Sequence, residues 1–334
     1  MPRATPRTTY RCLLPVAART VLGALALAAA TLVAAQGTFP ERSIRVVVPQ
    51  PAGGAGDTVT RIVAQRLAVR LGTPVVVENR AGAGGTLGTA IVAKAPADGY
   101  TLVFASTGYA TFQAMYPKLT FDPATDLAPL AMIGSVPFLF LVRNDAPFRS
   151  VAEMIAFAKA QPGKLNYATA GNGSLSHLLS AWLMAEAGIQ MTHIPFSGTA
   201  PALGALLGGQ VDMAFDPITT SAALVAAGKA RALAVSGGAR ARGTPNIPTL
   251  VESGYPVRGA VWLALMLPAG VPAPISARLN REINAVLQEP EVRAQLQSRD
   301  IDIDAQTPEQ FSAFLASEIR TWGKIVRDIG IKAE

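Results

Sequence analysis

The chain has 334 residues and a formal net charge of +7, half of its residues are hydrophobic, and Cys12 is its single cysteine. One cysteine can form neither an intrachain disulfide nor a thiolate metal site, so stability must come from core packing. Four of the 29 basic residues precede residue 20, and without them the formal charge falls to +3, which removes the main support for nucleic-acid binding.

The first 35 residues have the pattern of a secretory signal peptide. Four arginines precede an apolar run at residues 21–33, and Val33-Ala34-Ala35 supplies small residues at the cleavage positions. A membrane anchor is the alternative, but the apolar run is too short to span a bilayer comfortably. We therefore expect export with cleavage near Ala35. No later segment has the length and apolarity of a transmembrane span.

Strands and helices alternate from the start of the mature chain. Short β-branched runs alternate with amphipathic stretches, which predicts βαβ units and a largely parallel sheet. The predicted strands in this part are residues 44–48, 74–78 and 101–105, and the predicted helices are residues 57–71 and 86–93.

A second block repeats this pattern. Ser150 and Glu153 form a capping box that opens a helix, which stops before Pro162. The remaining predicted helices of the block are residues 175–187 and a segment that begins at 199 or 201 and ends at 208, and the predicted strands are residues 165–169, 192–195, 211–215 and 231–235.

Two long apolar runs, at residues 132–142 and 261–267, bracket the second block. Each has more apolar residues than one buried strand usually needs, so each can be a strand that crosses between two lobes. Two further helices are predicted, one around residues 275–288 and one at 308–329 that opens at Thr307-Pro308-Glu309-Gln310. The sequence predicts an α/β protein with lobe 1 at residues 36–138 plus 260–334 and lobe 2 at residues 139–259. Each lobe is expected to be a mostly parallel sheet flanked by helices.

Catalytic motifs are incomplete. The two histidines, His177 and His193, fall in different predicted elements, and His177 is interpreted as a hydrogen-bonded residue near a helix start. The stretch around Ser174 is similar to a nucleophile elbow, but Ser176 stands where the last glycine is required. A metal site is not predicted, because the sequence has too few metal-binding side chains at the required spacing.

Glycine clusters do not complete a nucleotide-binding motif either. Gly82, Gly84, Gly85 and Gly88 have the spacing G-x-G-x-x-x-G, and no acidic residue ends the next strand, so a tight structural turn is the favoured interpretation. The run that begins at Gly53 lacks the Lys-Ser/Thr of a phosphate loop. We expect no cofactor.

Five strand-to-helix loops share a polar, largely uncharged composition. In open α/β sheets such loops lie at the carboxyl ends of strands, where ligands bind. They contain Gly, Ser, Thr or Asn and no Lys or Arg, so an anion there would be held by backbone N–H groups, hydroxyls and helix ends. The loops are residues 50–57, 106–109, 169–174, 196–199 and 216–220.

Some loop residues have a structural alternative. Asp57 and Asp216 precede helices, so each is interpreted as an N-cap or as a partner for a ligand ammonium or hydroxyl. Ser174 can cap a helix and bind a ligand at the same time. Tyr109 and Phe196 lie within the loops and are predicted either as walls of the cleft or as core.

These motifs together resemble the Bug receptors, the periplasmic solute-binding proteins of tripartite tricarboxylate transporters. The resemblance covers nearly the whole mature chain, and it rests on the order and spacing of the matching stretches. They are residues 49–57, 76–80, 82–85, 96–102, 170–177, 193–198, 209–212 and 231–235.

The resemblance implies a two-lobe, type II periplasmic-binding fold that closes on a small carboxylated solute in the periplasm. The implied partners are the membrane components of a tripartite tricarboxylate transporter. A report to a sensor kinase stays open, and no nucleic acid is expected. A periplasmic α/β enzyme that acts on a small carboxylate is the alternative function.

The resemblance also implies a set of binding residues. Carried over by position, these are Gly53, Gly54, Asp57, Ser106, Thr107, Thr169, Asn172, Ser174, His177 and Asp216, and the loops add Gly173, Tyr109 and Phe196. The chain departs from the family pattern at Gln50, where an aromatic residue is usual, at Ser197, where a basic residue is common, and at Pro217, where an amide is common. We therefore expect a site that gains the Gln50 amide and loses a stacking wall.

Overall fold

The computed structural model describes residues 39–116, 118–328 and 330. The predicted signal peptide lies outside the described residues. The chain divides into two units, Met1–Glu41 and Arg42–Glu334, and the helices and strands of the described residues all belong to the second. Within the described part of the chain, no helix combines the length and the apolarity needed to cross a membrane.

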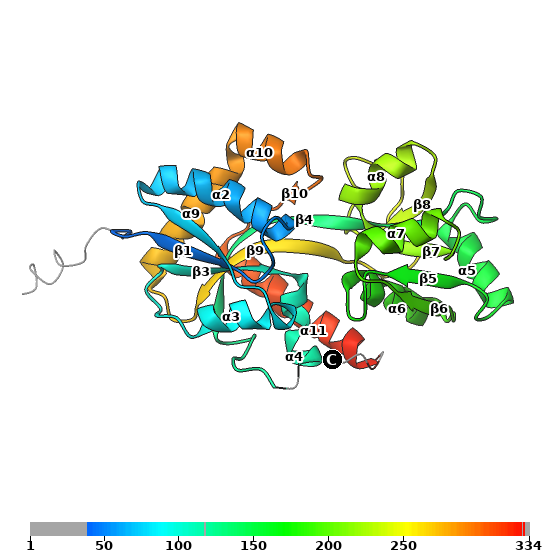
Figure 1. Ribbon diagram of the computed structural model, residues 1–334, viewed down its shortest axis with the longest axis horizontal. Helices are drawn as coiled ribbons and strands as arrows, with labels where there is room; N and C mark the ends of the chain where they lie inside the picture. Colours follow the sequence, from blue (N-terminus) through cyan, green and yellow to red (C-terminus); the bar gives the residue numbers. More distant parts are fainter. Residues whose placement is uncertain (1–38, 117, 329, 331–334) are drawn as a thin grey trace, which may run out of the picture. The chain divides into compact units, whose positions relative to one another are not determined.

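The first part of the sheet is built mainly from the N-terminal strands (Figure 1). β1 (Ile44–Val48) lies between β2 (Val75–Asn79) and β3 (Thr101–Ser106), and both neighbours are parallel to it. β9 (Ala260–Pro268) pairs antiparallel with β3 and with the long strand β4 (Leu127–Arg143). The carboxyl ends of β1, β2 and β3 therefore lie at one edge of the sheet.

Helices cover this part of the sheet on both faces. In Figure 1 one group lies on one side of the strands and comprises α2 (Ala55–Leu71), α9 (Ala273–Gln288) and α10 (Pro290–Gln297). The other group comprises α3 (Thr86–Ala93), α4 (Phe112–Met115) and α11 (Pro308–Asp328). In β1, Val46, Val47 and Val48 are at most 1% exposed, as a strand covered on both faces requires.

The second part of the sheet contains the middle of the chain. β7 (Met213–Pro217) and β8 (Ala230–Val235) pair antiparallel with β4, and β5 (Asn166–Thr169) lies parallel between β7 and β6 (Thr192–Pro195). The helices of this part are α5 (Val151–Ala160), α6 (Leu175–Ala187), α7 (Thr199–Leu207) and α8 (Ile218–Ala226).

Two segments connect the parts. β4 pairs with β9 as far as Pro137 and with β7 from Phe138 onward, so one continuous strand serves both parts of the sheet. The chain returns through Gly259, which exchanges two hydrogen bonds with Ser236, and enters β9 at Ala260. This arrangement is the predicted pair of crossover segments; the lobe boundaries at 138/139 and 259/260 stay a prediction.

The structure corrects several predicted elements. α2 begins at Ala55, two residues early, with Gly54 at its N-cap position. β7 extends through Pro217 and α8 follows at once, so the loop predicted at residues 216–220 does not exist. Sequence analysis also missed the short helices η2 (Thr107–Thr111) and α4 and the strand β10 (Asp302–Ile303), which are too short to give a periodic signal, and the eight-residue helix α10.

Candidate functional site

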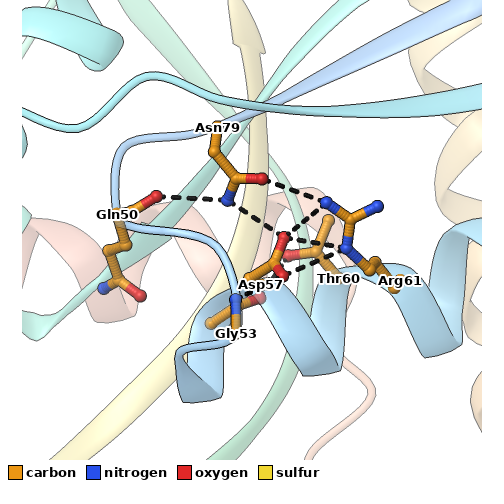
Figure 2. Close-up of polar contacts among 7 residues, drawn as sticks. Gln50, Gly53, Asp57, Thr60, Arg61 and Asn79 are labelled. Carbon is orange, nitrogen blue, oxygen red and sulfur yellow. Dashed lines mark hydrogen bonds and ion pairs between the residues drawn. The ribbon is translucent and has the colours of Figure 1, made fainter.

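A hydrogen-bonded network fixes the first predicted loop (Figure 2). The Asp57 carboxylate accepts hydrogen bonds from the Gly53 N–H at 2.9 Å, from Arg61 Nε at 3.0 Å and from Asn79 Nδ2 at 3.0 Å. Asn79 Nδ2 also donates to the Gln50 carbonyl at 3.1 Å. Asp57 is 4% exposed, and its bond to Arg61 lowers the pKa of its carboxyl from 3.8 to about 2. The carboxylate is therefore ionised and holds the loop from within.

Asp57 is not the N-cap of α2. That position belongs to Gly54, and Asp57 is the third residue of the helix, where a negative charge still favours the positive end of the helix dipole. Its carboxylate reaches back to Gly53, ahead of the helix, and so shapes the loop. A direct contact between Asp57 and a solute stays a prediction.

Sequence analysis missed Arg61 and Asn79 as members of this site. Arg61 lies one helical turn after Asp57, and this i,i+4 spacing of opposite charges is a signal that could have identified the pair. Asn79 ends β2 directly opposite Val48 of β1, so its position follows from the sheet and not from the local sequence. The loop contains no cation, but the Arg61 guanidinium balances the charge of Asp57.

We expect Asp57→Asn to lower the free energy of unfolding at pH 7 by about 1–2 kcal/mol, because an amide cannot accept all the bonds made by the carboxylate. The folded pKa is lower than the unfolded one, so the contribution of Asp57 is present above pH 3.8 and disappears as pH falls toward about 2. Urea unfolding at pH 7 and pH 2 measures both effects. Lys324→Ala, which breaks an exposed ion pair with Asp328, should change stability by less than about 1 kcal/mol and serves as control. Equal stability of wild type and Asp57→Asn at pH 7 would contradict the expectation.

A small pocket of about 50 Å³ lies beside this loop. It brings together three predicted residues, Gln50, Ser106 and Tyr109. Its other lining residues are Pro49, Gly84, Gly85, Thr89, Phe104, Ala105, Gly108 and Phe112. The glycine turn at residues 82–85, interpreted from sequence as purely structural, therefore also borders the pocket. The volume suits a small polar group or a few waters.

Two residues of the second loop have hydroxyls committed to the protein. The Thr107 hydroxyl donates to the Ala260 carbonyl at 2.9 Å and accepts from the Trp262 N–H at 3.0 Å. The Tyr109 hydroxyl donates to the Pro123 carbonyl at 2.6 Å, and burial raises the pKa of this phenol. Tyr109 is 3% exposed, so it borders the pocket from the core. Thr107 thereby ties the second loop to the crossover strand β9.

The third loop ends in a confirmed cap. Ser174 is the N-cap of α6, and its Oγ accepts from the His177 N–H at 3.4 Å and donates to the Gly171 carbonyl at 2.7 Å. The Gly173 N–H donates to His177 Nδ1 at 3.2 Å. Asn172, at the tip of the loop, is exposed. The loop is thus folded by its own side chains and leaves its tip open to solvent.

The two histidines meet next to this loop, although they fall in different elements of the sequence. Their rings are stacked, with centroids 4.0 Å apart and planes at 18°. Parallel pairing places His193 of β6 opposite Tyr167 of β5, and the Tyr167 ring stacks on the His193 ring with centroids 5.0 Å apart. Burial and the charge of His193 lower the pKa of His177 from 6.5 to about 4, and burial lowers the pKa of His193. Both rings are neutral at pH 7.

His193 Nε2 lies 2.7 Å from Thr169 Oγ1, a hydroxyl–imidazole pair of the type found in nucleophilic catalysis. The sequence gives no indication of this pair. Thr169 is 0% exposed, however, and its hydroxyl oxygen also accepts from the Gly171 N–H at 3.3 Å. A nucleophile must be reachable by its substrate, so this pair holds the loop and does not attack.

The remaining predicted residues follow β6 and β7. The Phe196 N–H donates to the Thr169 carbonyl at 3.0 Å, which places the fourth loop beside the third; Phe196 is half-buried and Ser197 is exposed. Asp216 is 2% exposed, and burial raises the pKa of its carboxyl from 3.8 to about 6. It is not an N-cap as predicted, because it is extended opposite Leu139 of β4 and the cap position is Pro217.

The predicted residues thus form two groups. Gln50, Gly53, Gly54, Asp57, Ser106, Thr107 and Tyr109 lie at the carboxyl ends of β1 and β3, and Thr169, Asn172, Gly173, Ser174, His177, Phe196, Ser197 and Asp216 lie at those of β5, β6 and β7. Each group includes a helix N-terminus, that of α2 or α6, with backbone N–H groups free of an intrahelical partner. Such ends suit an anion.

Several known proteins are similar to this chain in sequence and in fold. The family model described as the tripartite tricarboxylate transporter family receptor matches residues 59–331. Protein BugT of Bordetella pertussis is 37% identical over 298 residues, which cover 88% of this chain and 91% of BugT. Two solved structures from Rhodopseudomonas palustris are similar. MatC with bound malate has 34% identity and a TM-score of 0.70, over 86% of this chain and 100% of MatC. Rpa4515 with adipate has 32% identity and a TM-score of 0.73, over 88% of this chain and 99% of Rpa4515.

These matches extend across both parts of the sheet and the loops at their strand ends. The type II periplasmic-binding fold, expected from the resemblance, is thereby confirmed. The chain belongs to the receptor family of the tripartite tricarboxylate transporters.

Proposed function

We propose that this chain is a periplasmic receptor that captures a small carboxylated solute between its two groups of loops. It then delivers the solute to the membrane components of a tripartite tricarboxylate transporter. The main support is the pair of helix N-termini at α2 and α6, each preceded by a glycine-containing loop held by internal hydrogen bonds. MatC and Rpa4515, which share the fold, hold malate and adipate, both carboxylates.

Neutral groups hold the solute carboxylate in this proposal. The Arg61 guanidinium lies beside the first loop, and the Asp57 carboxylate already balances its charge at 3.0 Å. His177 and His193 are neutral, and Asp216 is a buried acid. Backbone N–H groups, the Ser106 hydroxyl, the Gln50 amide and, when it turns from the Gly171 carbonyl, the Ser174 hydroxyl remain as donors. We therefore expect the affinity to depend only weakly on salt compared with an Arg-clamped site.

The enzyme alternative is disfavoured by the geometry of the groups that could perform chemistry. Thr169 is fully buried, and His177 Nδ1 accepts a backbone N–H and not a hydroxyl. Ser174 pairs with Ser176 and the Gly171 carbonyl. Binding without turnover is thus the proposal, and a role in reporting to a sensor kinase stays open.

A thermal-shift screen of carboxylic acids tests the function. A solute at about 100 times its Kd adds roughly 2.7 kcal/mol of stability, which raises Tm by about 5–10 °C for a chain of this size. Malate, adipate, citrate, glutamate and benzoate are suitable first probes. Mass spectrometry after incubation should recover the bound acid unchanged. Product formation in proportion to protein concentration would favour the enzyme instead.

Ser174→Ala should weaken binding of the identified acid by about 1–3 kcal/mol, or about 5- to 150-fold, if the hydroxyl contacts the solute. Ser150→Ala is the matched control, because Ser150 is the N-cap of α5 and its Oγ likewise accepts the N–H three residues on. Both variants should lose about 1 kcal/mol of stability through the lost cap. Calorimetry should find weaker binding in Ser174→Ala alone. Unchanged binding in both variants would place the carboxylate elsewhere.

A further inference from the structure

His193 makes a contact that the proposed site depends on. Its Nε2 lies 2.7 Å from Thr169 Oγ1, at the point where β5 ends and the third loop begins. Its ring stacks on His177, whose Nδ1 accepts the Gly173 N–H near the other end of the same loop. The two stacked imidazoles therefore hold both ends of the loop Thr169–Ser174.

The hydrogen bonds constrain the proton positions. Thr169 Oγ1 accepts the Gly171 N–H at 3.3 Å, and its own proton can go to the Gly171 carbonyl at 3.4 Å or to His193 Nε2 at 2.7 Å. The shorter distance favours donation to His193, which then carries its ring proton on Nδ1. His177 accepts at Nδ1 and carries its proton on Nε2. With this assignment the two rings have opposite tautomers, and the bond from Gly173 requires an unprotonated Nδ1 on His177.

We propose that His193 is a positioning residue of the solute site, which acts through Thr169 to hold the loop Thr169–Ser174 in the conformation that receives the solute. The inference rests on the proposed function. A glycine-rich loop such as this has many conformations available, and fixing one of them in advance lowers the entropic cost of binding. The contact of His193 with Thr169 orients the hydroxyl that in turn holds Gly171.

Two substitutions distinguish the contribution of His193 Nε2 to affinity from that of the imidazole ring. His193→Phe keeps a ring that can stack on His177 and removes Nε2. His193→Gln keeps a polar group that can reach Thr169 and removes the ring. If Nε2 positions the loop, His193→Phe should weaken binding about 2- to 12-fold, the equivalent of one hydrogen bond. His193→Gln should bind with an affinity within about threefold of wild type, because its amide can replace Nε2.

A double-mutant cycle with Thr169→Val tests whether the effect passes through Thr169. Valine has the shape of threonine without the hydroxyl. In that background, His193→Phe should have no further effect on affinity, because the bond it would break is already absent. A purely structural role of the His193 ring would instead give the same loss in both backgrounds.

Nitrogen-15 NMR of histidine-labelled protein gives a readout without solute. The chain has two histidines, so two ring systems are observed and His193→Gln assigns them. The expected result at pH 7 is one Nδ1–H ring, His193, and one Nε2–H ring, His177. The same tautomer in both rings, or a charged ring at pH 7, would overturn the proposed geometry.

Calorimetry uses the acid with the largest thermal shift among malate, adipate, citrate, glutamate and benzoate. If none of them binds wild type, the proposed function fails, and the role of His193 fails with it. If one binds and His193→Phe binds equally well, the receptor function stands and the inference is overturned. Equal weakening by Phe and Gln, or additive losses in the cycle with Thr169→Val, would also overturn it.

Discussion

Replacing Gly88 with alanine will lower the free energy of unfolding by about 2–3 kcal/mol, whereas the same change at Gly204 will leave it equal or raise it by up to about 1 kcal/mol. Both glycines lie inside helices, α3 and α7, so the gain in helix propensity is the same. A Cβ at Gly88 would lie 2.6 Å from the Arg80 carbonyl oxygen and 2.9 Å from Pro49 Cβ. At Gly204 nothing lies within 4 Å. Backbone atoms cannot move aside as a flexible side chain can.

The same substitution should also disturb the site. Pro49 lines the small pocket together with Gly84 and Gly85, so pushing α3 away from Pro49 changes the pocket wall. We expect Gly88→Ala to weaken binding of the screened acid and Gly204→Ala to leave it unchanged. Urea unfolding and calorimetry on both variants measure this. Equal stability of Gly88→Ala and Gly204→Ala would show that α3 yields at low cost and would contradict the expectation.

Sequence patterns predicted the elements whose ends have local signals. β1, α3, α6 and β6 have the predicted bounds, because β-branched runs and caps such as Ser174 define their ends locally. The two-residue strand β10 and the one-turn helix α4 were missed, since two strand residues or a single helical turn give no repeating pattern. The apolar run at residues 132–142 predicted that β4 serves two parts of one sheet, but β4 begins earlier, at Leu127, and ends at Arg143.

The site was predicted as a set of loops but not as a set of contacts. Loop composition and the order of strands placed Gln50 and Ser106 at the same edge of the sheet, and both line the small pocket. The contacts of Asp57 with Asn79 and of His177 with His193 were not predicted. Asn79 lies on β2, the neighbour of β1, and His193 lies on β6, the neighbour of β5, so neither contact can be read from the local sequence. Such pairs depend on sheet register, and that is set by tertiary packing. Neither predicted aspartate cap formed: α2 begins two residues before Asp57, and the backbone at Asp216 is held extended by β4.

His177 and Asp216 will give opposite pH dependences of stability when each is removed in turn. Both are at most 9% exposed, and burial disfavours the charged form of each. Burial lowers the pKa of His177 from 6.5 to about 4 and raises that of Asp216 from 3.8 to about 6. The two titration windows overlap between pH 4 and pH 6, so their effects on stability largely cancel in the wild type.

The pH dependence of the free energy of unfolding has opposite signs for His177 and Asp216. Below pH 6.5 the unfolded chain binds a proton at His177 that the folded protein does not, so the His177 contribution is present above pH 6.5 and is lost as pH falls toward 4. Between pH 3.8 and 6 the folded protein binds a proton at Asp216 that the unfolded chain does not. The Asp216 contribution is therefore present below pH 3.8 and is lost as pH rises through 6.

Urea unfolding of wild type, His177→Asn and Asp216→Asn from pH 7 to pH 4 measures both contributions as differences, so that other titrating groups cancel. As pH falls from 6.5 to 4, the stability of wild type relative to His177→Asn should decrease by about 2 kcal/mol. Relative to Asp216→Asn it should increase by about 2 kcal/mol over the same range. Lys324→Ala, at an exposed pair on α11, should follow wild type throughout. Parallel curves for all four proteins would mean that neither group is buried in the folded protein as described, and with His177 exposed the stacked pair beside the third loop would not exist.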